Sequence, residues 1–500
     1  MKNEIEHLDS LLRTGNLSEV ERRLSLINPK EWPRPQVAAL ASIARRAGVF
    51  KFSLRLLNPF VRPSIRRPTQ ASPQEKLEYG AALGGLGAVS EGLTLLKSLA
   101  HTELPELSFH IALLHFREWE YREAIPHLKK FITQKSIDPY RKLVGQLNLA
   151  AAFEFVYEDN GSRELEPLLH SLAHQTRTQG FERILANTLE LTAQVAIKKR
   201  HWREAEELLR ESGALLRSSG GTEPLFVRKW QAILKLFRGG DSEESQMALR
   251  EVREIATRLR AYETLRDCDY HEGLFTARSS LISKVYFGTP YPSYRARLEK
   301  ELERRGLGRE SLADTIIWNL DAKEPRGHLD LSSGENSFHP QTYFKPQQKL
   351  LTLLRTLAQD FYKPSTTTTL FSKIYPDRHF NLESSPNCVY QLLHRLRQEL
   401  ARANIPLTVF ESRGDFTLSG PLSLKVCSAP SSNPPKSLLN LIRTLQGRVG
   451  DASFTSAEAA KIIKTSRRSM NRLLTEAVHR QLLDTEGRAR ATRYKIASLE

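Results

Sequence analysis

Residues 119–128 read WEYREAIPHL, and residues 201–209 read HWREAEELL. Two earlier segments repeat the pattern, GVFKFSLRLL at 48–57 and GAVSEGLTLL at 87–96. In each segment, apolar residues recur at helical spacing around one small residue. These small residues are Ser53, Gly92, Ala124 and Ala205. They are 39, 32 and 81 positions apart, and the last gap is about two periods of 40. Small side chains allow neighbouring helices to approach closely, so the pattern predicts stacked helical hairpins.

Helical periodicity extends from residue 1 to about residue 285,. The recurring second-helix pattern resembles the tetratricopeptide and related helical-hairpin repeat families, although their first-helix Trp, Leu, Gly and Tyr consensus is mostly absent. The resemblance implies an α-solenoid whose concave surface contacts a protein partner or a second copy of the chain. We expect the aromatic residues of this part to lie in the core.

Length and charge restrict the class of protein. The chain has 500 residues, 40% of them apolar, and a formal net charge of +17. It is therefore expected to form two to four packed domains and to bind a polyanion such as DNA, RNA or an anionic membrane surface. The positive charge is concentrated at residues 435–500, where 13 Lys and Arg stand against 6 Asp and Glu. A solvated basic surface is the simpler explanation of this excess.

Cysteine usage and apolar runs indicate the compartment. Cys268, Cys388 and Cys427 are far apart, so the sequence predicts neither a disulfide framework nor a zinc site,. The N-terminus lacks an apolar signal region, and no run approaches the roughly 18 apolar residues of a membrane span. We therefore expect a cytoplasmic protein that does not bind membranes.

The C-terminal stretch predicts a DNA-binding element. Residues 454–478 read FTSAEAAKIIKTSRRSMNRLLTEAV, and residues 482–496 read LLDTEGRARATRYKI. Thr455 and Glu458 have capping-box spacing. A second helix follows from Thr465 or Ser466, and then a basic hairpin. This order is typical of a winged helix-turn-helix.

The second helix of that stretch has two distinct faces. Met470, Leu473, Leu474, Ala477 and Val478 form its apolar stripe,. The opposite face carries Arg467, Arg468, Asn471, Arg472 and Thr475. Arginine can read guanine and asparagine can read adenine in the major groove. The hairpin adds Arg488, Arg490, Arg493 and Lys495 for the backbone or minor groove,. A winged helix that binds proteins through an exposed charged helix remains the alternative.

Residues 315–418 predict a second winged helix. Residues 315–320 and 328–331 are predicted to form a small antiparallel sheet. Helices are predicted over 347–361, 367–375 and 387–403, the last capped by Ser385. Strands on both sides of 412–414 predict a wing. This order resembles the output domain of bacterial two-component response regulators, whose Arg-Gly-x-Gly-Tyr wing is similar to Arg413-Gly-Asp-Phe416 here, with Asp-Phe in place of Gly-Tyr.

The resemblance implies that the helix over 387–403 faces DNA. Its buried side is predicted to hold Val389, Leu392, Leu393, Leu396 and Leu400. Its outward residues are Asn387, Gln391, His394, Arg395 and Gln398, and we expect Arg413 of the wing to contact DNA with them. The alternative is a dimerising or degenerate winged helix that no longer reads DNA. No receiver domain is expected before it, because the N-terminal half lacks alternating strands.

The predicted fold is mainly α: an N-terminal α-solenoid of helical hairpins followed by two winged helix-turn-helix domains with small antiparallel sheets. The expected domains are the repeats at 1–285, a helical connector at 286–314, winged helices at 315–426 and 438–500, and a flexible linker at 427–437.

The sequence favours a DNA-binding transcription regulator with double-stranded DNA and a protein partner or second copy as partners. Nucleotide-binding and metalloprotease motifs are absent, so no catalytic residue, metal or cofactor is predicted. The alternative is a protein-interaction scaffold. RNA binding is less favoured, because no aromatic stacking platform is present.

Overall fold

The computed structural model describes residues 2–62, 70–156, 163–217, 223–308, 312, 315–321, 324–339, 344, 348–427, 436–450, 452–463, 465–466, 470–471, 473–474, 477–478, 482–486 and 492–496. The chain divides into two compact units, Met1–Val426 and Cys427–Glu500.

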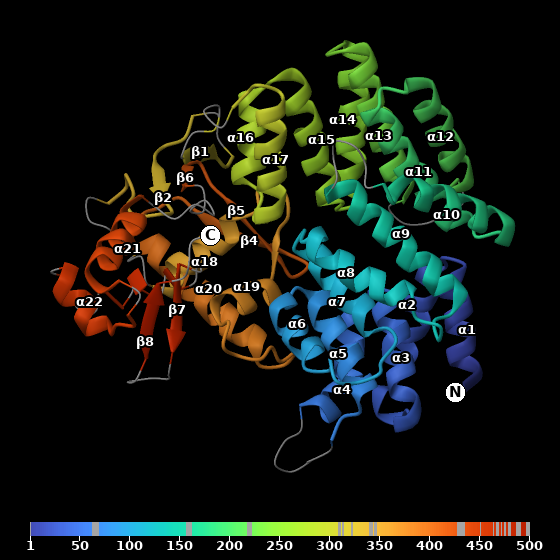
Figure 1. Cartoon of the computed structure of the whole chain (residues 1–500), viewed down its shortest axis with the longest axis horizontal. Helices are drawn as coiled ribbons and strands as arrows, with labels where there is room; N and C mark the ends of the chain where they lie inside the picture. The colour runs from blue at the N-terminus through green and yellow to red at the C-terminus, as the bar shows by residue number, and fades with distance from the viewer. Residues whose placement is uncertain are drawn as a thin grey trace. The chain divides into compact units, whose positions relative to one another are not determined.

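The first unit begins with a long run of helices (Figure 1). They are α1 (Lys2–Arg13), α2 (Leu17–Leu26), the 3₁₀ turn η1 (Pro29–Glu31), α3 (Arg34–Arg46), α4 (Phe50–Val61), α5 (Pro73–Leu86), α6 (Val89–Lys97), α7 (Leu107–Arg117), α8 (Tyr121–Ile132), α9 (Pro139–Val156), α10 (Leu165–Gln179), α11 (Glu182–Lys198), α12 (Trp202–Leu215), α13 (Glu223–Gly239), α14 (Glu243–Arg258), α15 (Tyr262–Thr276), α16 (Ser279–Phe287) and α17 (Pro292–Arg304).

Most helices of this run pack against the next helix in sequence, and alternate helices also contact one another. Thus α3 contacts α5, α5 contacts α7, α9 contacts α11, and α13 contacts α15. Such stacking of hairpins is the geometry of an α-solenoid, in which one layer of helices forms a continuous inner wall.

One turn recurs between the helices. A residue with positive φ is followed by a residue whose N–H bonds to the carbonyl oxygen five positions earlier. The positive-φ residues of these turns are Gly15, Gly48, Gly87, Trp119, Gly180, Arg200, Arg260 and Ala277. Each helix thus ends at a residue in the left-handed conformation, and the chain reverses there so that the next helix runs antiparallel to the previous one. Trp119, Arg200 and Arg260 adopt it without the conformational freedom of glycine, so part of the turn signal is invisible in composition.

The small residues in the second helices have the predicted packing role. Ser53, Ala124 and Ala205 are fully buried. A Cβ atom on Gly92 would lie 2.6 Å from the Gly80 carbonyl oxygen of the preceding helix. Because that distance is shorter than real Cβ contacts, α5 and α6 can pack this closely only with glycine at this position.

The rest of the first unit mixes strands and helices. Its elements are β1 (Thr315–Asn319), β2 (His328–Asp330), α18 (Lys349–Ala358), β3 (Ser365–Thr366), α19 (Thr367–Ile374), α20 (Ser385–Arg402), β4 (Thr408–Ser412), β5 (Asp415–Ser419) and β6 (Ser423–Cys427).

These strands form two sheets, and one differs from the prediction. β3, β5 and β4 form an antiparallel sheet in that order. The pairing predicted between residues 315–320 and 328–331 is wrong, because the second sheet has the order β1-β6-β2. β2 runs parallel to β6, with His328 opposite Ser423. The loop between β1 and β2 therefore does not form a hairpin, since a later strand lies between them.

The mixed part shares a hydrophobic core with the first repeats. One cluster of buried residues joins Leu40 and Leu83 of α3 and α5 to Leu354, Leu393 and Phe416 of α18, α20 and β5. The apolar faces of these elements are therefore buried against residues hundreds of positions away. Residues 315–426 are part of the first unit rather than a separate compact body.

Polar contacts connect the same two parts at both ends of the repeat run. Near its start, the Glu91 carboxylate accepts a hydrogen bond from the Phe380 N–H at 2.8 Å. Near its end, the fully buried Arg266 donates to both carboxylate oxygens of Asp360, at 2.8 and 2.7 Å. An exposed pair, Arg260 and Asp415, lies 2.9 Å apart.

The second unit contains α21 (Lys436–Val449), α22 (Ser456–Ile463), β7 (Leu483–Glu486) and β8 (Arg493–Ile496). Its own core includes Ile442, Leu445, Phe454, Met470 and Leu474. β7 and β8 pair antiparallel.

The predicted fold class, mainly α with an N-terminal solenoid of helical hairpins followed by helices and small sheets, is confirmed, although one of these sheets contains the parallel pair β2–β6. Within the described parts of the chain, none of the helices combines the length and apolar composition needed to cross a membrane.

Candidate nucleic-acid interface

Helix α20 separates the predicted apolar and polar faces. Val389, Leu392, Leu393, Leu396 and Leu400 are buried. The residues predicted to face DNA are all exposed: Asn387, Gln391, His394, Arg395 and Gln398. His394 and Gln398, one turn apart, are joined by a 3.0 Å hydrogen bond between Nε2 atoms. The helix therefore presents one continuous polar face of amide, imidazole and guanidinium groups.

The start of α20 differs from the predicted cap. The helix begins at Ser385, and Ser384 in the cap position makes no side-chain capping bond. The Ser385 hydroxyl instead accepts a hydrogen bond from the Asn381 N–H at 2.8 Å. Ser385 thus fixes the loop before the helix, while Pro386 stands in the first turn, where its missing N–H costs no hydrogen bond.

The predicted wing is the hairpin of β4 and β5. Ser412 pairs with Asp415 across a two-residue turn. The two turn residues, Arg413 and Gly414, have φ of 55° and 82°. Positive φ at both positions is the geometry of a type I′ turn, which matches the twist of paired strands. Arg413 is exposed at the tip.

The Asp-Phe pair that replaces Gly-Tyr has clear structural roles. Phe416 is fully buried in the shared core. Asp415 bonds to Arg260 of the repeats, with 2.9 Å between Nη1 and Oδ2. Tyr390 of α20 donates its hydroxyl hydrogen to Glu411 of the wing at 2.7 Å. These hydrogen bonds join the wing to α20 and to the repeats. They therefore fix the position of Arg413 relative to the exposed face of α20.

Arg395 and Arg413 are the two exposed guanidinium groups of the predicted interface in this unit. Among the described residues, neither guanidinium lies within ion-pair distance of a carboxylate. Arg397, by contrast, donates to the Val409 carbonyl oxygen at 3.1 Å and supports the fold. Exposed arginines of this kind can bind phosphate oxygens without first breaking an internal ion pair.

Two exposed aromatic residues of this part were missed at the level of sequence. Phe410 is 58% exposed and Tyr390 is 40% exposed. The strand period of two could have placed Phe410, because its neighbour Val409 is buried and successive side chains point to opposite faces,. No comparable signal marks Tyr390 on its helix.

The second unit contains the other predicted interface. The capping box is confirmed: Glu458 N–H donates to Thr455 Oγ1 at 3.3 Å, and Thr455 N–H donates to Glu458 at 2.7 Å. Residues 470–471, 473–474 and 477–478 are helical. Met470, Leu474 and Ala477 are buried, as the predicted stripe requires.

Two of the predicted DNA-binding residues of this unit, Asn471 and Arg493, are among the described residues. Asn471 is exposed. Arg493 on β8 is exposed, but its guanidinium donates to Ser453 Oγ at 2.9 Å and to the Ser453 carbonyl oxygen at 2.6 Å. The other predicted residues lie outside the described residues: Arg467, Arg468, Arg472, Thr475, Arg488 and Arg490.

Comparisons with known proteins give only distant similarity. No protein-family model matches the chain, and no curated protein matches it either. Among solved structures, a Rap protein complexed with competence and sporulation factor is similar at 11% identity and a TM-score of 0.44, covering 62% of this chain and 93% of that one.

The apo form of the quorum sensor NprR from B. thuringiensis is similar at 14% identity and a TM-score of 0.37, covering 62% of this chain and 98% of that one. NprR in complex with its cognate peptide NprX has 16% identity and a TM-score of 0.39, with coverage of 60% and 88%. Similarity this low leaves function to be argued from the residues of this chain.

Proposed function

We propose that this protein is a DNA-binding transcription regulator that uses two winged helices, at residues 315–426 and 438–500. The helical repeats before them would bind a protein partner or a second copy of the chain. The observation that carries the proposal is the exposed polar face of α20 beside a hairpin with Arg413 at its tip. A helix of this size fits the major groove, and an adjacent hairpin can reach the flanking backbone.

Electrostatics supports the same conclusion. The net charge of +17 favours association with a polyanion,. Arg395 and Arg413 would contact phosphates or guanine, while Asn387, Gln391 and His394 would contact base edges. In the second unit, Asn471 and the arginines 467, 468 and 472 would do the same on another part of the site.

The test is binding of the full chain to mixed duplex DNA, measured by fluorescence anisotropy at two salt concentrations. If about four or more phosphates are neutralised, the affinity falls by about an order of magnitude for each doubling of salt. Binding that is absent or insensitive to salt would refute the proposal.

Variants separate the two interfaces. The R395Q/R413Q variant tests the first unit, and R467A/R468A/R472A tests the second. Each lost phosphate contact should reduce, by about 1, the steepness with which the logarithm of the DNA affinity falls with the logarithm of salt concentration. R228Q is the matched control, because Arg228 is an exposed arginine of the repeats that pairs with Glu251. A variant that binds as tightly as R228Q would remove its interface from the proposal.

A protein-binding role is the second candidate, favoured by the exposed Tyr390 and Phe410. Exposed aromatic side chains are typical of the centres of protein interfaces,. If α20 binds a protein, F410A should weaken capture of that protein and leave DNA affinity unchanged. If α20 binds DNA, R395Q/R413Q should weaken DNA binding while F410A affects it little.

A further inference from the structure

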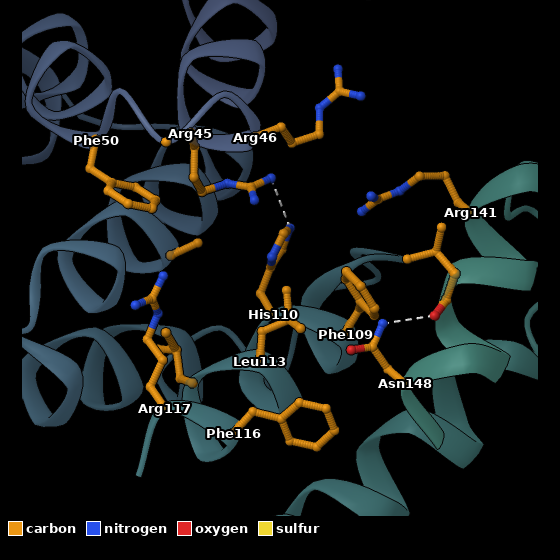
Figure 2. Close-up of a pocket in the computed structure, with 14 residues that line it drawn as sticks. Arg45, Arg46, Phe50, Phe109, His110, Leu113, Phe116, Arg117, Arg141 and Asn148 are labelled. Carbon is orange, nitrogen blue, oxygen red and sulfur yellow. Dashed lines mark hydrogen bonds between the residues drawn. The ribbon is translucent and has the colours of Figure 1, made fainter. Parts of the chain in front are cut away.

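A pocket of about 520 Å³ opens among helices α3, α4, α7 and α9 of the repeats (Figure 2). This volume lies within the range of sites for small molecules. Its wall comes from the end of α3, the start of α4, most of the length of α7 and one face of α9, together with Ala81 of α5. The DNA proposal uses none of these residues, so the pocket requires a separate explanation.

The charge of the pocket wall is one-sided. Arg45, Arg46, Arg117 and Arg141 line it, and among the described residues no aspartate or glutamate does. Figure 2 shows Arg45 and Arg141 on either side of His110, with Arg117 on the side of Phe50 and the guanidinium group of Arg46 pointing away from His110. A wall with several guanidinium groups and no carboxylate favours an anion.

Three of these arginines are held from behind by carboxylates outside the lining. Arg45 donates from Nε to Glu78 at 2.7 Å, and Arg141 donates from Nε to Glu106 at 2.9 Å. Arg46 pairs with Asp9 at 2.5 Å. Among the described residues, Nη2 of Arg141 is buried without a hydrogen-bond partner. The carboxylates fix the guanidinium groups in place and neutralise much of their charge.

Arg117 supplies charge that no such carboxylate compensates. The described residues place no acidic group within ion-pair distance of it, and its guanidinium carbon lies 5.5 Å from the Phe50 ring centre. Arg117 is exposed, so it stands where the pocket meets solvent. A guanidinium group without a counterion can pair with an anion there without first breaking an internal ion pair.

The same cluster argues against a cation. Ligand atoms of Glu78, Glu106 and His110 lie within 4.8 Å of one another, as a metal site would require. However, both carboxylates already bond to guanidinium groups, so a metal ion would meet like charge. Burial, and then the charge of Arg45, lower the pKa of His110, which disfavours the charged form of its ring.

Apart from His110 and Asn148, the remaining wall is apolar. Phe50, Phe109, Leu113 and Phe116 surround the space between the arginines. Aromatic and leucine side chains would bury a hydrocarbon body, while an inorganic ion would leave them in contact with water.

We propose that this pocket binds a small organic anion, with its charged group paired to Arg117 and its apolar body against Phe109, Leu113 and Phe116. The charged group is a carboxylate, sulfonate or phosphate, all of which accept the hydrogen bonds that guanidinium groups offer.

The test compares two fluorescent probes on the full chain. 8-Anilinonaphthalene-1-sulfonate carries an anion, and N-phenyl-1-naphthylamine has the same rings without it. The wild-type protein should bind the sulfonate more tightly, and R117Q should weaken sulfonate binding about tenfold without changing binding of the neutral probe. R117K should restore part of the affinity. R228Q should bind both probes like the wild type.

Two further measurements identify the preferred head group and check that the variant protein remains folded. Competition with decanoate and with phenyl phosphate identifies the preferred head group, and displacement by either supports the proposal. L113W should fill the pocket and abolish sulfonate binding while far-UV circular dichroism stays unchanged. Equal affinity of both probes, or unchanged sulfonate binding in both R117Q and L113W, would overturn the proposal.

Discussion

Replacing Asp360 with asparagine should destabilise the first unit, because it removes the nearer counterion of the buried Arg266 and leaves only Glu263, which is 40% exposed and 3.5 Å from Nη1. The Arg266 side chain is 0% exposed and Asp360 is 8% exposed. Among the described residues, Nε and Nη1 of Arg266 have no hydrogen-bond partner, so Asp360 is its principal support. Removing one partner of such a buried pair costs about 3–5 kcal/mol. Asparagine has nearly the same shape, so loss of packing adds little.

The corresponding change in melting temperature follows from the size of the unit. An unfolding entropy of about 2.1 cal/mol/K per residue, over a unit of 426 residues, converts this loss into a decrease of about 3–6 °C. The assay is thermal unfolding followed by circular dichroism. D415N provides the control, because the Arg260–Asp415 pair connects the same parts but is 41% and 25% exposed. It should cost less than about 1 kcal/mol.

A double-mutant cycle decides whether the effect belongs to the pair. R266M/D360N removes both charges, so it should be less destabilised than the sum of R266M and D360N. The reasoning would be refuted if D360N melted within about 1 °C of the wild type. Strict additivity of the two single variants would refute it as well.

Three further predictions concern single residues. Burial raises the pKa of Glu190 from its ordinary 4.5 to about 7. Protonation of Glu190 therefore stabilises the folded protein fully below pH 4.5, and this stabilisation is lost as the pH rises through 7. E190Q should raise the melting temperature at pH 8 but not at pH 4, and an equal effect at both pH values would contradict this. R200G should stabilise the protein by about 1 kcal/mol, because Arg200 has φ of 61° at an exposed turn,. G180A at the same kind of turn should destabilise it. In thermal unfolding, the two variants must shift the melting temperature in opposite directions. T455A should cost about 1 kcal/mol by removing the capping box of α22,, and unchanged amide hydrogen exchange in α22 would count against that.

The sequence predicted those features that depend on local spacing. The helical hairpins, the close approach at Gly92 and the capping box of Thr455 all follow from residues within one or two helical turns. The buried and exposed faces of α20 also followed from its period of 3.6 residues,.

Features that depend on distant partners could not be predicted. The partner of His328 in β2 is Ser423, because β6 lies between β1 and β2. A three-residue strand has no pattern that specifies such a neighbour. Apolar periodicity likewise shows that Leu393 is buried, but not that it shares a core with Leu40. The arginines of the pocket come from separate helices, and only the stacking of the hairpins brings them together.

The shared core has a consequence for how this architecture can change over generations. A recombination event near residue 314 would divide one hydrophobic core between two parents, so each half would present mismatched side chains to the other. The segment from Cys427 onward has its own core and can be exchanged as a cassette. Evolution can therefore replace the segment from Cys427 onward in one step, whereas core substitutions within residues 315–426 must be accompanied by substitutions in α1–α5.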